Sequence, residues 1–258
     1  MKQLKTEAIT LDTVDVFDAD RSLLLFTQEV GKVRARARGV RKPTSRLGGH
    51  LLPYLPVMVE LVMGSGGYLV TQAQLSDNYR KMVYPDNPLA FLQQAGTVSE
   101  AVNRLFIDNE PHPAIYEGLV YTLGRLLDRC VKGEEVGVVA ITAEFLLKCL
   151  VELGYTPELY QCVVTSQPVT AEFTGWSHSL GGVLSEAGYR EVADRYQVQS
   201  KTVVALREFS KPTFMAERLG MPPEVAQETF ETIFGYLQYQ IGQPLKSLGN
   251  RVTMTRPG

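Results

Sequence analysis

Residues 57–75 read VMVELVMGSGGYLVTQAQL and contain a clear hairpin signal. Two apolar runs, Val57–Met63 and Tyr68–Leu75, flank the turn Gly64-Ser65-Gly66-Gly67. A short turn rich in Gly and Ser between two runs of strand-forming residues is typical of a β-hairpin. We therefore predict two antiparallel strands joined at this turn.

Three further strand segments precede this hairpin. They are residues 5–17 (KTEAITLDTVDVF), the compact apolar segment Ser22–Thr27 and a basic segment that begins at Gly31. An open sheet of five short strands would leave edges that need covering, so a small closed barrel is favoured. We predict an N-terminal five-stranded oligonucleotide-binding barrel (OB-fold). Aromatic residues on such a barrel can stack on bases or pack in the core or rim, and the candidates are Phe17, Tyr54 and Tyr68.

The segment Gly31–Gly49, GKVRARARGVRKPTSRLGG, carries seven cations and no carboxylate. Its first four cations alternate with small apolar residues, so a strand would place the cations on one face and the apolar residues on the other. A cationic strand face that continues into a basic loop suits a polyanion such as a nucleic-acid backbone, and a merely solvated face is the alternative. The predicted DNA-binding residues are Lys32, Arg34, Arg36, Arg38, Arg41, Lys42 and Arg46.

Charge is unevenly distributed along the 258-residue chain, whose formal net charge is −2. Residues 1–80 carry a net charge of +3, residues 81–160 carry −5, and residues 161–258 carry zero. Any binding to nucleic acid must therefore come from a local patch and not from bulk charge. No signal peptide and no apolar run long enough to span a membrane is found, so we expect a cytoplasmic protein without a membrane partner.

The remainder of the chain has helical periodicity, with one interruption. Apolar residues at spacings of three and four predict three helices: one over residues 88–109, a second that begins near Pro113, and a third that ends near Gly154. The third helix is apolar on nearly all sides, so we expect it to be buried at the centre of a helical bundle. Further helices are predicted from about 190 to 210 and from Pro222 to Ile241, after a short β-rich segment. The predicted domains are 1–80 (barrel), 81–156 with 190–258 (helical), and 157–189 (insertion).

The insertion has one cysteine at a position suited to zinc and lacks the others. A four-cysteine zinc ribbon needs two CxxC pairs, because structural zinc takes four ligands in a tetrahedron. Cys162 could open the first pair, but the other three positions are Thr165, Ser185 and Gly188. We therefore expect no metal, and predict that packing holds the insertion together.

No catalytic constellation is found in the sequence. Phosphate-binding loops, dinucleotide-binding motifs and HExxH or GxSxG motifs are missing. His50, His112 and His178 have no partner that the sequence identifies, and we expect Cys130 and Cys149 to be buried packing residues. These observations favour a binding protein without a cofactor over an enzyme.

Several stretches, in order, resemble the RecO family of bacterial recombination mediators. They are KTEAITL, LLLFTQEVGKVRARARGVRKPTSRLGG followed by LLPYLP, FLLKCLVELGYTPELYQC, LGGVLSE and YLQYQIGQPLKSL. The resemblance covers most of the chain. It implies an α+β protein with an N-terminal OB-fold, an α-helical domain and a zinc-ribbon-like insertion that is degenerate here.

The resemblance also implies a function in DNA repair and recombination through the RecF pathway. Members of the family bind single- and double-stranded DNA, anneal complementary strands, act with RecR, recognise the C-terminal tail of single-stranded DNA-binding protein (SSB), and so help RecA load. We assign DNA contact only to the basic positions that match the family, Lys32 to Arg46. The resemblance also implies that the protein is found at the nucleoid. The alternative is an OB-fold module whose main ligand is RNA or a protein partner.

Overall fold

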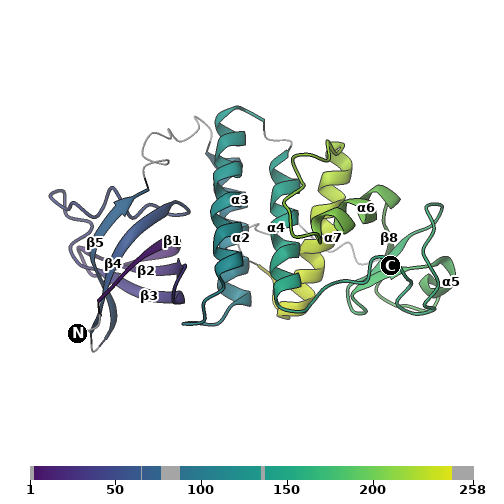
Figure 1. Ribbon diagram of the computed structural model, residues 1–258, viewed down its shortest axis with the longest axis horizontal. Helices are drawn as coiled ribbons and strands as arrows, with labels where there is room; N and C mark the ends of the chain where they lie inside the picture. The colour runs from purple at the N-terminus through teal and green to yellow at the C-terminus, as the bar shows by residue number, and fades with distance from the viewer. Residues whose placement is uncertain (1–2, 65, 77–87, 135–136, 246–258) are drawn as a thin grey trace. The chain divides into compact units, whose positions relative to one another are not determined.

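The computed structural model describes residues 3–64, 66–76, 88–134 and 137–245, and Figure 1 labels its helices and strands. The chain divides into two compact units, Met1–Val131 and Lys132–Gly258, each described below by itself. The first unit contains the barrel and two helices, and the second contains the remaining helices and a small sheet. The domain boundaries predicted from the sequence divide the chain differently and stay predictions; residue 81, the predicted start of the helical domain, lies outside the described residues.

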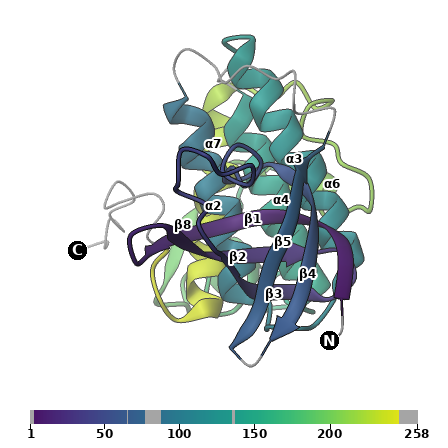
Figure 2. The same cartoon turned by 90° about the vertical axis from the view of Figure 1, so that its left-hand side faces the viewer.

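Five strands form the closed barrel that the sequence predicts. They are β1 (Gln3–Val16), β2 (Asp20–Thr27), β3 (Gly31–Ala37), β4 (Pro56–Gly64) and β5 (Gly67–Leu75). Their order around the barrel is β1-β2-β3-β5-β4, and β4 pairs with β1 to complete the circle. In Figure 2, β1 and β2 run across the view and β4 and β5 cross them steeply. Gly64 pairs with Gly67 at the end of the β4–β5 hairpin, which confirms that prediction.

The barrel interior is filled by side chains that alternate along each strand. Leu23 and Leu25 of β2, Val33 of β3, and Val57 and Val59 of β4 are buried and belong to one apolar cluster. Burying an aliphatic side chain of this size contributes about 1.5–3 kcal/mol. Because the side-chain period of a strand is two, residues between these face outward, and this periodicity sets which β3 residues meet solvent.

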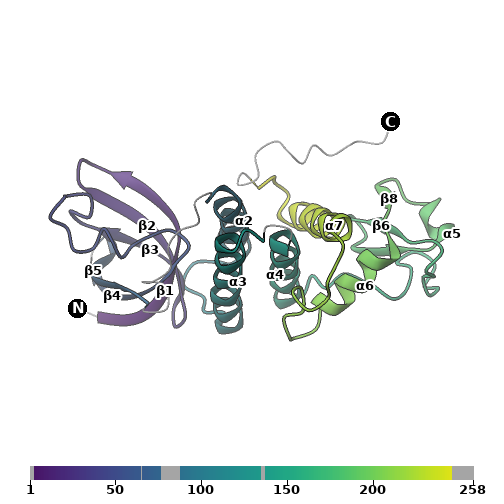
Figure 3. The same ribbon diagram turned by 90° about the horizontal axis from the view of Figure 1, so that it is seen from above.

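Helices α2 (Leu89–Leu105) and α3 (Pro113–Val131) complete the first unit. The Phe26 ring of β2 lies 6.2 Å from both the Phe106 ring and the Tyr116 ring, measured between centroids. Figure 3 shows α2 and α3 side by side. The aromatic contacts join β2 to the end of α2 and to the first turn of α3, so the helices are packed on the barrel itself.

The α2–α3 connection also binds β3 through the backbone. Asn109 donates its backbone N–H to the carbonyl of Lys32, at 2.9 Å. Gly31 has a φ of +69°, and a Cβ atom at this position would lie 1.9 Å from the Glu110 carbonyl oxygen. Only glycine allows the connection to approach β3 this closely.

The second unit is built on α4 (Val138–Glu152), which packs against α6 (Ser200–Phe209) and α7 (Pro223–Ile241). Most of α4 is buried, as its apolar sequence predicts. The buried carboxylate of Glu144 accepts hydrogen bonds from the backbone N–H groups of Met215 and Ala216, at 2.6 and 2.9 Å. Burial raises the pKa of Glu144 in spite of these bonds. This carboxylate thus connects α4 to the segment between α6 and α7.

The region of the predicted insertion (157–189) forms a three-stranded sheet in the order β7-β6-β8, whose strand β8 lies beyond residue 189. Its elements are β6 (Gly175–Ser177), β7 (Gly182–Leu184), the short helix α5 (Glu186–Tyr189) and β8 (Arg195–Gln197). The prediction of a helix from residue 190 is wrong for its first ten residues, because α6 starts at Ser200. Strand β8 pairs with β6, so a contact distant in sequence overrides the helical pattern.

His178, which looks isolated in the sequence, has two partners in the second unit. The indole Nε1–H of Trp176 donates to His178 Nδ1 at 3.0 Å, and His178 Nε2 lies 3.2 Å from the hydroxyl of Tyr196. Because Nδ1 accepts a hydrogen bond, the neutral ring carries its proton on Nε2. A Cβ at Gly235 of α7 would lie 2.6 Å from the imidazole, so the insertion packs closely on α7. Burial lowers the pKa of His178 to about 4.

We expect Gly31→Ala to lower the free energy of unfolding by about 2–4 kcal/mol, because it adds left-handed strain to a backbone clash. Gly39→Ala is the matched control in the same unit. Gly39 also has a positive φ (+62°), but its added Cβ would meet nothing closer than 3.7 Å, so we expect a loss of about 1 kcal/mol. Chemical denaturation of both variants tests this, and equal losses would contradict the close approach of Glu110.

The depressed pKa of His178 predicts a loss of stability in mild acid. The unfolded chain takes up a proton near pH 6.5 that the folded chain resists until about pH 4. The contribution of neutral His178 to the free energy of unfolding is thus fully present above pH 6.5. We expect up to about 3 kcal/mol of it to be lost as the pH falls to 4. Trp176 is the single tryptophan, so its fluorescence reports unfolding here. His178→Gln, which does not titrate, should show a shallower pH dependence; an unchanged profile would refute the role of His178.

Candidate nucleic-acid interface

Strand β3 presents its cations on the outside of the barrel. Val33, Ala35 and Ala37 are buried in the barrel core, as the alternating pattern predicts. The residues between them face outward, and among these Arg34 is exposed on the strand. Arg38 is exposed immediately after the strand ends. The expected cationic face therefore exists, but its members differ in their environment.

Lys32 is a correction to the expected exposed row of four cations. It lies on the outward face of β3, but the end of α2 and the α2–α3 connection cover it, and it is 6% exposed. Its ammonium donates to the backbone carbonyl of Asn103 at 2.6 Å and lies 3.2 Å from the carboxylate of Asp108. A buried ammonium needs such partners, because removing it from water without them is costly. Lys32 therefore holds β3 to the helices. Its ammonium is buried and is not exposed for the predicted contact with DNA.

Arg36 is partly exposed and engaged with Asp20, the first residue of β2. The guanidinium donates from Nε to Asp20 Oδ2 at 2.9 Å, and the other oxygen of Asp20 accepts from the backbone N–H of Gly39 at 2.8 Å. The Gly39 hydrogen bond, together with Arg36, lowers the pKa of Asp20 in spite of the opposing effect of burial. One carboxylate thus fixes both the Arg36 side chain and the turn that follows β3.

The basic loop after β3 is anchored at both ends. Val40 and Leu51 are buried in the barrel core, and the Arg41 backbone N–H donates to the Ala19 carbonyl at 3.0 Å. Arg41 also lies 3.3 Å from the carboxylate of Asp15. The loop is therefore seated against the β1–β2 turn, with its cationic side chains outward.

Four of the seven predicted cations are exposed and form no ion pair within the part of the chain that the structure describes. They are Arg34, Arg38, Lys42 and Arg46. A cation without a carboxylate partner can bind a phosphate without first losing an existing ion pair. These four residues are therefore the part of the predicted site best suited to polyanion contact.

The three aromatic candidates separate clearly by environment. Tyr54 is half-buried, with its ring 6.5 Å from that of Phe91 in an edge-on contact. Tyr68 is partly buried against the barrel core. Phe17, in the turn between β1 and β2, is 74% exposed. Of the three, Phe17 is the one whose ring is largely exposed to solvent.

Arg207 and Lys211, two cations of the second unit, have local partners. Arg207 donates from Nε and Nη2 to the carbonyl of Leu159 and lies over the Tyr160 ring, 4.6 Å from its centroid. The Lys211 ammonium is 2.6 Å from the carboxylate of Glu208. These contacts account for both cations within the second unit.

The four positions compared with a zinc ribbon in the sequence lie close together in the structure. The Thr165 backbone N–H donates to Cys162 Sγ at 3.5 Å, and the Thr165 and Ser185 hydroxyls are 3.2 Å apart. A Cβ at Gly188 would lie 2.5 Å from Cys162 Sγ. Burial raises the pKa of the Cys162 thiol, but hydrogen bonds from Ser185 and Thr165 outweigh this and lower it to about 6. Hydrogen bonds and close packing thus connect the four positions.

No metal-ligating group is evident in the described ranges, where no cluster of three or more His, Cys, Asp or Glu residues has the geometry for a metal ion. Cys130, Cys149 and Cys162 are buried and form no disulfide, and the burial of the first two confirms the prediction for them. Among the described helices, none is long and apolar enough to cross a membrane.

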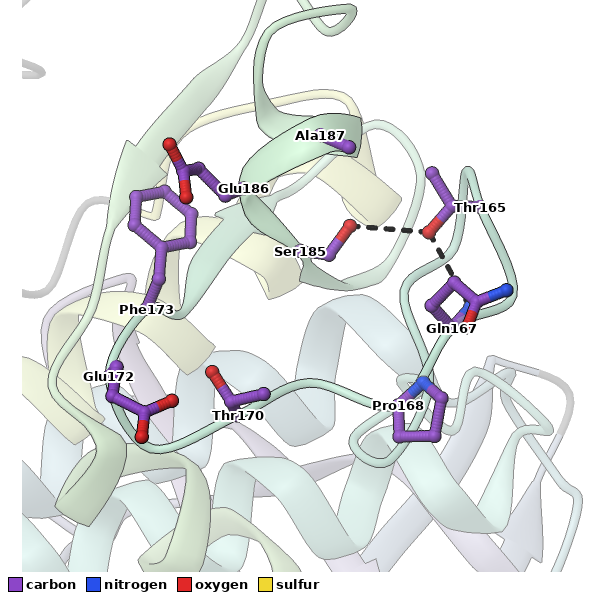
Figure 4. A pocket seen from close by; sticks show the side chains of 9 residues that line it. All are labelled: Thr165, Gln167, Pro168, Thr170, Glu172, Phe173, Ser185, Glu186 and Ala187. Atoms are coloured by element: carbon purple, nitrogen blue, oxygen red, sulfur yellow. Dashed lines mark hydrogen bonds between the residues drawn. The ribbon is translucent and has the colours of Figure 1, made fainter.

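A hollow of about 410 Å³ lies beside these ribbon positions. Figure 4 shows Thr165 and Ser185 on one side of it and Phe173 and Glu186 on the other. Its charged residues are Glu172 and Glu186, and its lining contains no cation. The hollow is therefore unsuited to phosphate, and the β3 surface remains the candidate interface.

The closed five-stranded barrel followed by helices places the protein in the class of OB-fold-like proteins with an appended helical region. Two family models match the chain: "Recombination protein O N terminal" over residues 1–79 and "Recombination protein O C terminal" over residues 94–249. The chain therefore belongs to the RecO family, and is a DNA repair and recombination protein.

Curated relatives agree with this assignment, and those described here are named DNA repair protein RecO. The protein of Bifidobacterium adolescentis is 26% identical over 96% of this chain and 98% of its own length. That of Cutibacterium acnes is 32% identical over 71% of this chain and 73% of its own length. That of a Nostoc species is 28% identical over 95% of this chain and 94% of its own length.

Restoring the three missing thiols tests whether the insertion is a zinc ribbon that has lost its metal. We expect T165C/S185C/G188C to retain about one zinc ion per chain, because Cys162 would then complete a set of four thiolates. The control T165C/S185C keeps glycine at 188 and supplies three thiolates, so it should retain less. Metal analysis after gel filtration measures both. Failure of the triple variant to hold zinc would show that the four positions do not share the geometry of a ribbon.

Proposed function

We propose that this protein is a non-enzymatic DNA-binding mediator of the RecF pathway. It binds single- and double-stranded DNA through phosphates, anneals complementary strands, and helps RecA load on SSB-coated DNA together with RecR. It reaches this DNA through the C-terminal tail of SSB and works in the cytoplasm, at the nucleoid. The family membership supports this role, and the observation that carries it is the set of exposed, unpaired cations on and after β3.

Binding in this proposal is electrostatic. Each cation that neutralises a phosphate releases a counterion, so the binding constant falls as salt rises. Four cations, Arg34, Arg38, Lys42 and Arg46, correspond to a slope of about −3 for log K against log salt on single-stranded DNA. Phosphates are the same in every sequence, so binding by this surface is largely independent of base sequence.

Annealing follows from the same surface. Two strands that approach each other repel through their phosphates, and a cationic surface lowers this repulsion. A surface that holds the backbone leaves the Watson–Crick edges free to find their partners, whereas deep base readout would cover those edges. The anchored basic loop keeps its cations beside β3 without building a base-reading pocket.

We expect R34E/R38E to weaken binding to single-stranded DNA at least 10-fold, at about 50 mM salt, and to reduce the salt slope by about 1.5. Annealing and RecA loading should fall in parallel. The control R190E/R218E makes the same change in net charge on exposed residues of the second unit. Fluorescence anisotropy with a labelled oligonucleotide measures both variants.

Full DNA affinity in R34E/R38E would reject the β3 surface as the DNA site. If the wild-type protein bound RNA or a protein partner far more tightly than DNA, the alternative of an OB-fold module with another main ligand would replace this proposal. An equal loss in both double variants would mean that net charge alone determines binding.

A further inference from the structure

The turn between β1 and β2 holds an aromatic residue in an unfavourable position. Phe17 has a φ of +57°, in the left-handed region that bulky side chains rarely adopt. Its ring is 74% exposed to solvent. Neither its backbone conformation nor burial of its ring favours phenylalanine here, and glycine or asparagine would suit the turn better. Backbone strain that brings no gain in packing is frequent at binding sites.

The exposed ring is held in one place by the cationic strand. The guanidinium of Arg36 lies over the Phe17 ring, 4.9 Å from its centroid. Arg36 is itself fixed by Asp20, the residue that begins β2, through contacts of 2.7 and 2.9 Å. One face of the ring is thus covered by a positioned cation. The ring contacts Arg36, and Arg36 lies between the exposed cations Arg34 and Arg38 in the sequence.

This arrangement fits an unpaired base. A nucleobase stacks on an aromatic face, and a guanidinium on the other face of the ring adds a cation–π contact. The neighbouring cations are positioned for the phosphates of the same nucleotide chain. Bases inside a duplex are already stacked on each other, so the ring has no base face to meet there.

We infer that Phe17 is a base-stacking residue that makes the β3 surface prefer single-stranded over double-stranded nucleic acid. The inference rests on the proposed function, since it assumes that the β3 cations hold the phosphates. It adds a contact with a base to a surface otherwise limited to the backbone. It also assigns the strained β1–β2 turn to ligand binding.

Three probes of equal length test it: a dT oligonucleotide, an abasic oligonucleotide and a duplex. We expect Phe17→Ala to weaken binding to the dT oligonucleotide about 5- to 100-fold. Binding to the abasic strand and to the duplex should stay within about 2-fold of wild type, because both lack an available base. Val14→Ala is the matched control, since Val14 is an exposed apolar residue of the adjoining strand β1 (59% exposed).

A second variant separates stacking from structure. Phe17→Asn removes the ring but suits the left-handed turn, so its melting temperature should equal or exceed that of wild type while its affinity for the dT oligonucleotide falls. Phe17→Trp should keep the affinity, and its fluorescence should be quenched by the dT oligonucleotide and not by the abasic strand. The native Trp176 is fully buried and provides a constant background.

The outcomes distinguish this inference from the proposed function. If R34E/R38E loses affinity for DNA and Phe17→Ala does not, Phe17 is not a stacking residue, and the proposal that the β3 cations bind phosphates is retained. If Phe17→Ala weakens binding to all three probes equally, the ring has a structural role in the β3 surface and contacts no base. That result also overturns the inference. If R34E/R38E keeps its affinity, the proposed DNA site itself is wrong.

Discussion

The buried ammonium of Lys32 is the contact on which the arrangement of the first unit depends. It ties the middle of the barrel sheet to the end of α2 through Asn103 and to the α2–α3 connection through Asp108. Breaking a buried charge pair by removing one partner is strongly destabilising, because the other charge is left without compensation. The outward face of β3 is thus divided: its first cation holds the fold together, and those that follow meet solvent.

Local patterns were enough to predict most of the elements, and distant contacts account for the errors. The Gly-rich hairpin, the five strands and the apolar α4 depend on residues near each other in sequence, so periodicity and turn chemistry identified them. The burial of Lys32 depends on a segment some seventy residues away, and β8 exists because β6 pairs with it. His178 looked isolated for the same reason: Tyr196 reaches it only in the folded sheet.

For the candidate site, the sequence identified the cationic strand but could not show which of its cations are exposed and which are held in ion pairs. Alternation placed the cations outward correctly, yet only the fold shows that Arg36 is held by Asp20 and that Arg41 is next to Asp15. The aromatic candidates were equivalent in the sequence, and the packing of Tyr54 against Phe91 separates it from the exposed Phe17. Cys162, Thr165, Ser185 and Gly188, which the sequence analysis compared with the ligand positions of a zinc ribbon, are in contact in the structure.

The barrel closes through a parallel pairing of β3 with β5, at Ala35 with Tyr68 and Arg36 with Leu69. Parallel partners cannot be joined by a tight turn, so this seam joins two hairpins, β2–β3 and β4–β5, that are separate in sequence. The strand that carries the cations thus contributes one side of a non-local seam. A ligand lying across β3 and β5 would bind the closed barrel more tightly than an open one, and would shift the equilibrium toward closure.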